Sequence, residues 1–411
     1  MRIKGRTIKR TVFVWIAAVL LFSCNKQPNE EPMKIEWDKI GSEGLQGDLT
    51  KGVSAAYAAL LEGQLIVAGG ANFPGKLGFE GGAKAFYDEI LSYDPANGFW
   101  KVIGKLPQPS AYGVSVPIPG GALWIGGNTA TESLASCYKV SLQENSIGSQ
   151  NDKELTPGVE WAPFLSLPAT MDNFSGCAIG ATVYVAGGNV NGIPSNTLHS
   201  INLENDSTWT ELPPFPGLPR VQPVMAAVEE KGKTYLYLLG GFFGGDTERE
   251  PGMAIDVLRY DPDVRSWEKM GEQVDPDTGE AFSLGGATTM PVDNRYILCL
   301  GGVNHDIFLD AITTQYKIAR DTSLTEEEKR ERNHEFSSHY MTQPIDYYRF
   351  NTECRVFDTK TGEWSTIDRT HNAARAGTTL VWKGYTFYAV QGELKPGVRS
   401  PETWKGEIIV Q

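Results

Sequence analysis

A short segment near the C-terminus combines residue types that can carry out proton transfer. Glu393 and Arg399 stand six residues apart, and Pro396-Gly397 between them predicts a turn that returns the guanidinium toward the carboxylate. A carboxylate can deprotonate a hydroxyl group, and an arginine can hold an anionic substrate group through two hydrogen bonds. The same spacing also fits a loop salt bridge worth less than about 1 kcal/mol, and spacing alone favours that simpler interpretation.

Other familiar catalytic motifs are missing from the sequence. It has no G-x-S-x-G nucleophile elbow, no Walker A loop and no C-x-x-C pair. The histidines lack H-x-x-x-H spacing, so no metal site is expected from His199, His305, His334, His339 and His371. Free, buried thiols are expected for Cys137, Cys177, Cys299 and Cys354. An enzyme built on this chain would therefore work without a cofactor, through ordinary side chains.

A repeat determines where this segment lies in the fold. Gly-Gly closes an apolar run five times, and Gln391-Gly392 is a degenerate sixth copy; the five doublets are 69–70, 126–127, 187–188, 240–241 and 301–302. A strand-like segment, a turn and a tryptophan follow most of them, which is typical of kelch units. Each unit forms a four-stranded antiparallel blade, so the sequence predicts an all-β, six-bladed propeller. Glu393 is the only acid directly after a doublet.

Two segments depart from the repeat. The sixth unit lacks its tryptophan, whereas Trp37 is unpaired at the other end, so the N-terminal strand is expected to complete the C-terminal blade and close the ring. A helical insertion is expected at about 306–345, with Ser323 as N-cap and Glu326 three residues on. The insertion fits either a lid over one mouth of the channel or a solvated, charged helix.

The N-terminus has the pattern of a lipoprotein signal. Five basic residues precede eleven unbroken apolar residues at 12–22, too few to span a bilayer as a helix. Leu21-Phe22-Ser23-Cys24 resembles a bacterial lipobox, in which Cys24 carries the lipid. The expected organisation is a signal peptide over 1–23, a tether over 24–33 and a propeller over 34–411. This predicts a periplasmic or outer-membrane-anchored lipoprotein of a Gram-negative-type bacterium, held to the membrane by lipid alone; an uncleaved anchor is the alternative.

The charge balance limits the partners of the chain. There are 37 Lys+Arg against 50 Asp+Glu, for a net charge of −13. Five of the basic residues and none of the acids lie in 1–23, so the processed chain would carry −18. Binding to nucleic acid needs a basic face that neutralises phosphates, and it is not expected here.

The G-E-x-K-P-G-x-R stretch at 392–399 resembles the active-site motif of the bacterial N-acetylneuraminate epimerases, sialic acid mutarotases that are six-bladed kelch propellers. Further segments are similar to that family but stand in cyclically permuted order: 68–75, 111–115, 215–220 and 301–308. A propeller tolerates permutation because each blade contacts only its neighbours. The match also favours the lid interpretation of the insertion.

The resemblance implies roles for individual residues. Glu393 and Arg399 take the catalytic positions, and Arg220 is implied as a partner for the substrate carboxylate. Asn72, Tyr112 and Arg375 are candidates at the channel mouth. The implied activity is interconversion of the α and β anomers of N-acetylneuraminate, an acidic sugar, by acid/base ring opening. The alternative is a non-catalytic carbohydrate-binding or scaffolding kelch lipoprotein.

Overall fold

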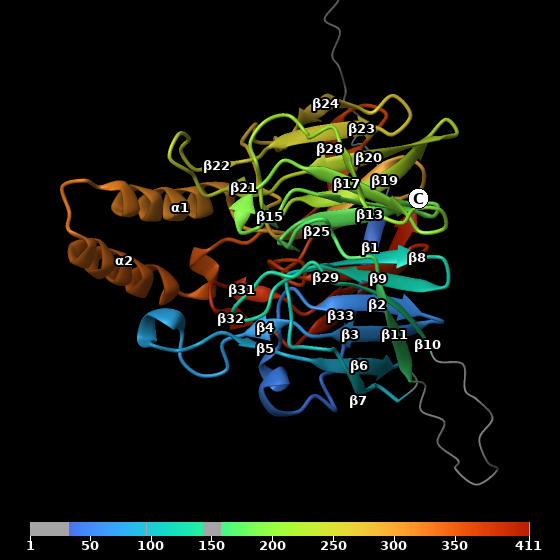
Figure 1. Ribbon diagram of the computed structural model, residues 1–411, viewed down its shortest axis with the longest axis horizontal. Coiled ribbons are helices and arrows are strands. Elements are labelled where there is room, and N and C mark those ends of the chain that lie inside the picture. Colours follow the sequence, from blue (N-terminus) through green and yellow to red (C-terminus); the bar gives the residue numbers. More distant parts are fainter. Residues whose placement is uncertain (1–32, 96, 143–157, 411) are drawn as a thin grey trace, which may run out of the picture.

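The all-β prediction is confirmed. The computed structural model describes residues 33–95, 97–142 and 158–410, and within these ranges strands far outnumber the two α-helices (Figure 1). The expected signal peptide, the lipidated Cys24 and the tether lie outside the described residues, except that Met33 already belongs to the first strand. No helix in these ranges has both the length and the apolar character needed to cross a bilayer.

Six four-stranded antiparallel sheets form the body of the molecule. In chain order they are β2 (Tyr57–Leu61), β3 (Gln64–Ala68), β6 (Glu89–Asp94) and β7 (Phe99–Lys105); β8 (Val114–Ile118), β9 (Gly121–Ile125), β10 (Cys137–Leu142) and β11 (Val159–Phe164); β13 (Ser175–Ile179), β14 (Thr182–Ala186), β17 (Leu198–Asn202) and β18 (Thr210–Leu212); β19 (Val224–Glu230), β20 (Lys233–Leu239), β23 (Asp256–Asp261) and β24 (Ser266–Glu272); β25 (Ala287–Val292), β26 (Tyr296–Gly301), β27 (Glu353–Asp358) and β28 (Glu363–Arg369); and β29 (Thr379–Lys383), β30 (Thr386–Val390), β33 (Thr403–Val410) and β1 (Met33–Ile40).

The first strands of the six sheets contact one another in cyclic order, an arrangement of the β-propeller type. Six backbone hydrogen bonds link residues that stand one or two positions before these strands. Each N–H donates to the carbonyl of the residue before it in the cycle, at 2.7 to 3.3 Å, and all six residues have positive φ: Ala55, Tyr112, Asn173, Gln222, Gly286 and Gly377. We call these residues the inner ring. The left-handed backbone at each position lets the N–H and the carbonyl point around the axis.

The doublets have a conformation that favours glycine. Both residues of every doublet have positive φ, including Gln391 and Gly392 of the degenerate sixth copy. Space is also short, since a Cβ at Gly301 would lie 2.2 Å from the carbonyl oxygen of Arg375. The short strands that follow the doublets include β4 (Ala71–Asn72), β15 (Asn189–Val190), β21 (Phe242–Phe243) and β31 (Glu393–Lys395), and they lie toward the helices in Figure 1.

Gly301→Ala is expected to destabilise the protein much more than Gly232→Ala, the matched control. Both glycines have positive φ, but a Cβ at Gly232 would meet nothing within 4 Å. The control should therefore lose only the roughly 1–2 kcal/mol that an L-residue loses in the left-handed region. Gly301→Ala should lose about 1–3 kcal/mol more by overpacking against backbone. Urea unfolding of both variants measures the difference, and equal losses would contradict this role of the doublets.

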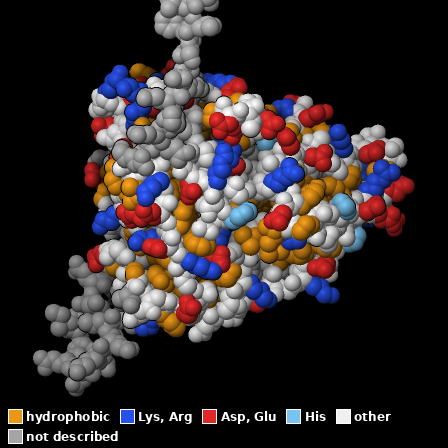
Figure 2. Space-filling view, turned by 180° about the vertical axis from the view of Figure 1, so that it is seen from behind, with side chains coloured by type: hydrophobic (Ala, Val, Ile, Leu, Met, Phe, Trp, Pro, Cys, Tyr) orange, Lys and Arg blue, Asp and Glu red, His pale blue; other side chains and the backbone are white. Residues whose placement is uncertain are grey.

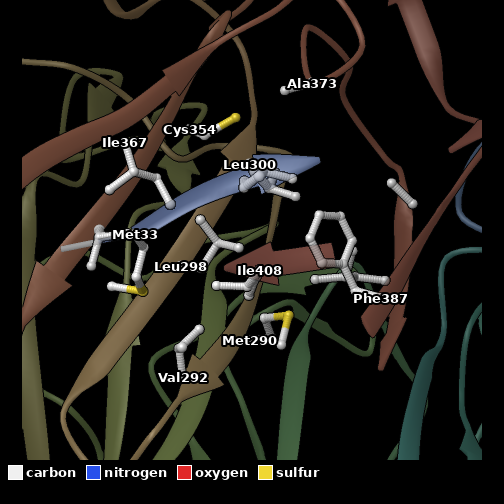
Figure 3. Close-up of a cluster of buried hydrophobic side chains, with 14 residues drawn as sticks. Met33, Met290, Val292, Leu298, Leu300, Cys354, Ile367, Ala373, Phe387 and Ile408 are labelled. Carbon is white, nitrogen blue, oxygen red and sulfur yellow. The ribbon is translucent and has the colours of Figure 1, made fainter. Parts of the chain in front are cut away.

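The N-terminal strand β1 lies at the edge of the last sheet. All eight of its residues pair with β33, from Met33 opposite Val410 to Ile40 opposite Thr403. Met33 of β1 and Ile408 of β33 point into one apolar cluster with Met290 and Leu298 of the fifth sheet (Figure 3). The two ends of the chain therefore share a core with the preceding sheet.

Tryptophan side chains connect neighbouring sheets. Four of them donate an indole N–H to a carbonyl at the end of the preceding sheet, in the pairs Trp100–Gly41, Trp209–Leu165, Trp267–Pro213 and Trp364–Glu272. Trp37 makes the corresponding bond to the carboxylate of Asp368, in the last strand of the fifth sheet, at 2.7 Å. Trp37 thus gives the last sheet the same kind of indole bond to its predecessor that these four tryptophans make.

The insertion is a helical hairpin and not a single helix. It consists of α1 (His305–Arg320) and α2 (Glu326–Met341), and Figure 1 shows both projecting from one side of the sheets. The expected N-cap at Ser323 is wrong by two residues. Thr325 caps α2, because its hydroxyl accepts from the N–H of Glu328 and the Glu328 carboxylate accepts from the N–H of Thr325, whereas Ser323 bonds to Asp321.

The four predicted free thiols are confirmed as free and buried. Burial in apolar surroundings raises the pKa of Cys177 to about 12. A thiol with so high a pKa is a poor nucleophile at neutral pH. These cysteines therefore serve as small apolar side chains of the core.

Candidate active site

The structure brings Glu393 and Arg399 together, as the turn at 396–397 predicts. The two residues pair across a short hairpin formed by β31 and β32 (Val398–Arg399). The Oε2 atom of Glu393 lies 3.4 Å from Nη2 of Arg399. The N–H of Gly397 donates to the other oxygen, Oε1, at 2.7 Å. About 23% of the Glu393 side chain is exposed, so its carboxylate is held in place but open to a ligand.

Arg399 keeps one hydrogen-bond donor without a partner. Its Nε donates to the hydroxyl of Ser54 at 3.1 Å, its Nη2 faces Glu393, and its guanidinium carbon lies 5.4 Å from the centre of the Phe73 ring. The third nitrogen, Nη1, is buried and has no partner among the described residues. Buried hydrogen-bond donors normally have a partner. An unpaired donor on Arg399, next to the Glu393 carboxylate, therefore indicates a place for an anionic acceptor.

Glu393 stands one step from the inner ring. Its backbone bonds to Ala376, the residue before Gly377, in both directions. Corresponding backbone bonds join the residue after each of the other doublets to the residue before its ring position, in the pairs Ser54–Ala71, Ala111–Asn128, Asp172–Asn189, Val221–Phe242 and Gly285–Val303. The six post-doublet positions are thus equivalent, and Glu393 is the only carboxylate among them.

An axial cavity of about 250 Å³ lies on the other side of the ring. Ring residues line it together with the first strands, from Ala56 to Trp382, and it includes neither Glu393 nor Arg399. The carboxylate and guanidinium therefore face the side of the doublets and the helices.

The helical hairpin of α1 and α2 ends directly against the β31–β32 hairpin, which carries Glu393 and Arg399. The ammonium of Lys395, two residues after Glu393, donates to the carbonyls of Met341 and Gln343 at 3.1 and 2.6 Å, at the C-terminus of α2. Burial, followed by the proximity of Tyr347 and of the Glu393 carboxylate, raises the pKa of Tyr348 to about 12. The structure thus places the insertion next to Glu393, as expected for a lid.

A second flap comes from the first sheet. The short 3-10 helix η2 (Gly78–Glu80) contacts α2, and the Phe79 ring lies 6.4 Å from the His334 ring. A Cβ on Gly397 would lie 2.4 Å from Leu77, so this flap also packs on the turn between Glu393 and Arg399. Two segments far apart in sequence therefore border the candidate site.

Arg220 and Arg375, predicted as substrate contacts, occupy equivalent positions within the fold. Each stands two residues before a ring residue and donates to the carbonyl of the first doublet residue in its own sheet, Gly240 at 3.4 Å and Gln391 at 3.2 Å. Each also pairs with a carboxylate near the start of the third strand, Arg220 with Asp256 at 2.5 Å and Arg375 with Glu402 at 3.0 Å. Only 1% and 3% of these side chains are exposed. Their donors therefore hold the doublets in place, which favours a structural role over contact with substrate.

The side chain of Asn72 is likewise engaged with the fold, whereas Tyr112 is held mainly through its backbone. The amide of Asn72 is buried, donates to the carbonyls of Asp48 and Gly52, and accepts from the hydroxyl of Tyr87. Tyr112 belongs to the inner ring, is half-buried and lines the axial cavity. Its hydroxyl accepts a 3.0 Å bond from Lys84.

Sequence reasoning missed Lys84, Phe73 and Ser54 as site residues. Ser54 and Phe73 contact Arg399, and the ammonium of Lys84 lies 5.8 Å from the centre of the Phe73 ring. Lys84 stands in a glycine-rich loop without a recognisable motif, so only the spatial arrangement identifies it. Phe73 lies in a segment with family resemblance, which is the one signal that could have found it.

The largest cavity suits an anionic ligand less well. It measures about 520 Å³, lies beside the fifth sheet, and is lined by three arginines and five carboxylates. Its buried Arg355 already pairs with Asp275 at 3.2 Å and with Glu353 at 3.4 Å. Negative charge is thus in excess there. Across the described ranges no group of three or more His, Cys, Asp or Glu is placed to hold a metal ion.

Fold and site together define a class of protein, an all-β chain of propeller type that holds a lone carboxylate against a guanidinium near its axis. Within this class the chain belongs to the N-acetylneuraminate epimerase family, whose model matches residues 23–148 and 164–411.

Individual relatives match over a shorter part of the chain. The N-acetylneuraminate epimerase of Haemophilus influenzae (strain 86-028NP) is 31% identical over 249 residues, which is 60% of this chain and 59% of that protein. The one from Pasteurella multocida (strain Pm70) is 28% identical over 242 residues, 59% and 58% of the two chains. A solved structure of YjhT is similar with a TM-score of 0.47 and 26% identity, covering 57% of this chain and 61% of that one. The chain thus spans under two thirds of the length of these relatives.

Proposed function

We propose that this protein is a sugar mutarotase that interconverts the α and β anomers of N-acetylneuraminate. Family membership and the names of the relatives support the substrate. The proposed scaffold is a closed six-bladed propeller over residues 34–411, supported by the six sheets, the hydrogen-bonded inner ring and the pairing of β1 with β33.

The open donor of Arg399 next to Glu393 is the observation that carries the proposal. In N-acetylneuraminate the anomeric carbon bears both the carboxylate and the anomeric hydroxyl. A site for this carbon needs an anion-binding group within a few ångströms of a proton acceptor. Arg399 Nη1 supplies the first and Glu393 the second.

In the proposed reaction Glu393 takes the proton of the anomeric hydroxyl. The bond between the anomeric carbon and the ring oxygen breaks, its electron pair stays on the ring oxygen, and that oxygen takes a proton. The open keto form rotates about the bond to the carbonyl carbon, and the hydroxyl then attacks the other face. Oxidation states are unchanged throughout, so the reaction calls for no redox partner. A positioned acid/base group contributes about 10²–10⁴-fold.

We further propose that the chain is a lipoprotein of the periplasm or the outer membrane, as its N-terminal sequence favours. Residues 1–23 would be removed, Cys24 would carry the lipid, and 24–33 would be the tether. Figure 2 shows that basic and acidic side chains intermingle on the face turned away in Figure 1, without a broad basic area among the described residues there.

Arg399→Lys is expected to raise the KM for N-acetylneuraminate about 10- to 100-fold. An ammonium is a point charge that cannot reach Ser54, Glu393 and the substrate carboxylate in the fork geometry of the guanidinium, and a hydrogen bond to a charged group contributes about 1.5–3 kcal/mol. Arg249→Lys, in an exposed pair with Asp246, is the matched control and should behave as wild type. The dependence of anomer exchange on sugar concentration measures both; an unchanged KM would remove Arg399 from substrate binding.

NMR exchange spectroscopy on equilibrated N-acetylneuraminate distinguishes an enzyme from a binding protein. The proposed function predicts exchange cross-peaks between the two anomers that grow with protein concentration. A non-catalytic carbohydrate-binding propeller would instead bind the sugar in calorimetry and leave the exchange rate at its value in buffer.

A further inference from the structure

An arc of side chains continues from Arg399 toward the second sheet. The Phe73 ring contacts two cations, with the guanidinium of Arg399 at 5.4 Å and the ammonium of Lys84 at 5.8 Å from its centre. Lys84 in turn lies 4.8 Å from the centre of the Tyr112 ring and 3.0 Å from its hydroxyl. Pairwise contacts thus run from Glu393 through Arg399, Phe73 and Lys84 to Tyr112, which also lines the axial cavity.

Lys84 carries an uncompensated charge. Its contacts are two aromatic faces and the Tyr112 hydroxyl, and it forms no ion pair with any residue that the structure describes. The Lys84 ammonium holds the Tyr112 hydroxyl through a charge-assisted hydrogen bond.

Tyr112 has a free proton to give. Its hydroxyl accepts from Lys84 and donates to no acceptor in the described part of the chain. The nearby Tyr348, by contrast, already donates its hydroxyl proton to the carbonyl of Tyr340. Ser54 accepts from Arg399 and faces the carbonyl of Ala71. Among these hydroxyls, only that of Tyr112 is left with an unused donor.

The backbone at Tyr112 is unusual for its side chain. Its φ is 62°, and the other five ring positions hold Ala, Asn, Gln or Gly. A bulky aromatic residue rarely adopts this conformation, and such outliers concentrate at functional sites. This backbone conformation holds the phenol of Tyr112 next to the axis. A small residue at this position would make the hydrogen bonds of the inner ring equally well.

We propose that Tyr112 is the second proton-transfer group of the mutarotase and that Lys84 positions it and supports its ionised form. This rests on the proposed function. As the ring opens, Glu393 takes the proton of the anomeric hydroxyl and Tyr112 gives its phenolic proton to the departing ring oxygen, leaving a phenolate beside the Lys84 ammonium. On reclosure the phenolate takes the proton back from that hydroxyl, while Glu393 returns its proton to the carbonyl oxygen.

Steady-state anomer exchange of N-acetylneuraminate by four variants tests this assignment. Tyr112→Phe should lower kcat about 10²-fold and leave KM within about twofold, because the ring is retained and only the proton is lost. Lys84→Met should lower kcat about tenfold, and Lys84→Arg should restore most of it, since a guanidinium keeps the positive charge. Tyr385→Phe, which loses an exposed hydroxyl bond to Asp293, is the control and should match wild type.

The outcomes separate this proposal from the function itself. Wild-type kcat in Tyr112→Phe, with active wild type, would overturn the role of Tyr112 alone. A Lys84→Arg variant as slow as Lys84→Met would overturn the charge-based role of Lys84. If Tyr112→Phe fails to fold, the two variants of the exposed Lys84 still test the proposal. Recovery of kcat in Lys84→Arg relative to Lys84→Met requires the positive charge and not the packing of the side chain. Absence of exchange by wild type would overturn the proposed function and this assignment together.

Discussion

Glu393→Gln is expected to lose about 10²–10⁴-fold in kcat for anomer exchange while the protein stays folded. The amide has the shape of the carboxylate and can still accept from the N–H of Gly397, but it cannot take a proton from the sugar. It also removes the charge that faces Arg399 at 3.4 Å. Because Glu393 is partly exposed and its hairpin is short, the thermal midpoint should change little.

The control for this substitution is Glu250→Gln, which alters an exposed glutamate away from the inner ring. It should exchange anomers as fast as wild type. Rates are compared by NMR at saturating N-acetylneuraminate, with circular dichroism melts of all three proteins. Equal kcat for wild type and Glu393→Gln would show that the carboxylate is not the base, whatever the activity of the chain.

Deletion of residues 33–41 is expected to unfold the whole protein. It removes β1, whose buried Met33, Ile35 and Ile40 each contribute about 1.5–3 kcal/mol by burial. It also removes eight residues of pairing with β33 and the Trp37 bond to Asp368. Domains are stable by only about 5–15 kcal/mol in total, so this loss should leave little or no net stability.

Circular dichroism and urea unfolding measure this effect, with Trp37→Phe as the graded control. That variant keeps the strand and loses mainly one hydrogen bond to a charged group, so it should be destabilised by about 1.5–3 kcal/mol and still unfold cooperatively. A deletion variant that melts at the wild-type temperature would refute the proposed closure of the ring by β1.

Much of the fold could be predicted because the repeat is encoded locally. Glycine doublets mark positions where backbone conformation and close approach exclude side chains, and these constraints appear in the sequence itself. The unpaired Trp37 indicated where the first strand belongs, since five of the six sheets use one indole N–H to reach their predecessor. Glu393 and Arg399 were found because a turn of six residues brings them together without help from the rest of the chain.

The remaining site residues could not be predicted, because their partners are distant in sequence. Arg220 and Arg375 look like anion-binding groups until Asp256 and Glu402 are seen to pair with them. Lys84 can be recognised as a site residue only from its hydrogen bond to Tyr112, which stands just before the next sheet. The start of α2 was misplaced because Ser323 and Thr325 are both good N-caps with a glutamate three residues on, and only the structure shows that the Ser323 hydroxyl bonds to Asp321 while Thr325 and Glu328 form the capping box.

Net charge sets a further requirement on the site. The processed chain would carry −18, which repels an anionic sugar over most of its surface. Arg399 and Lys84 on either side of Phe73 provide a local positive field at the doublet side of the ring. Salt should therefore weaken the general repulsion more than it weakens binding at the buried Arg399.

The central claim is that this chain accelerates anomer interconversion of N-acetylneuraminate through Glu393. The most direct test starts from a sample enriched in one anomer and follows its relaxation to equilibrium by NMR in buffer, with wild type and with Glu393→Gln. We predict that wild type shortens the relaxation in proportion to its concentration and that Glu393→Gln leaves it close to the rate in buffer. Relaxation at the buffer rate with wild-type protein that is folded and binds the sugar would contradict the account.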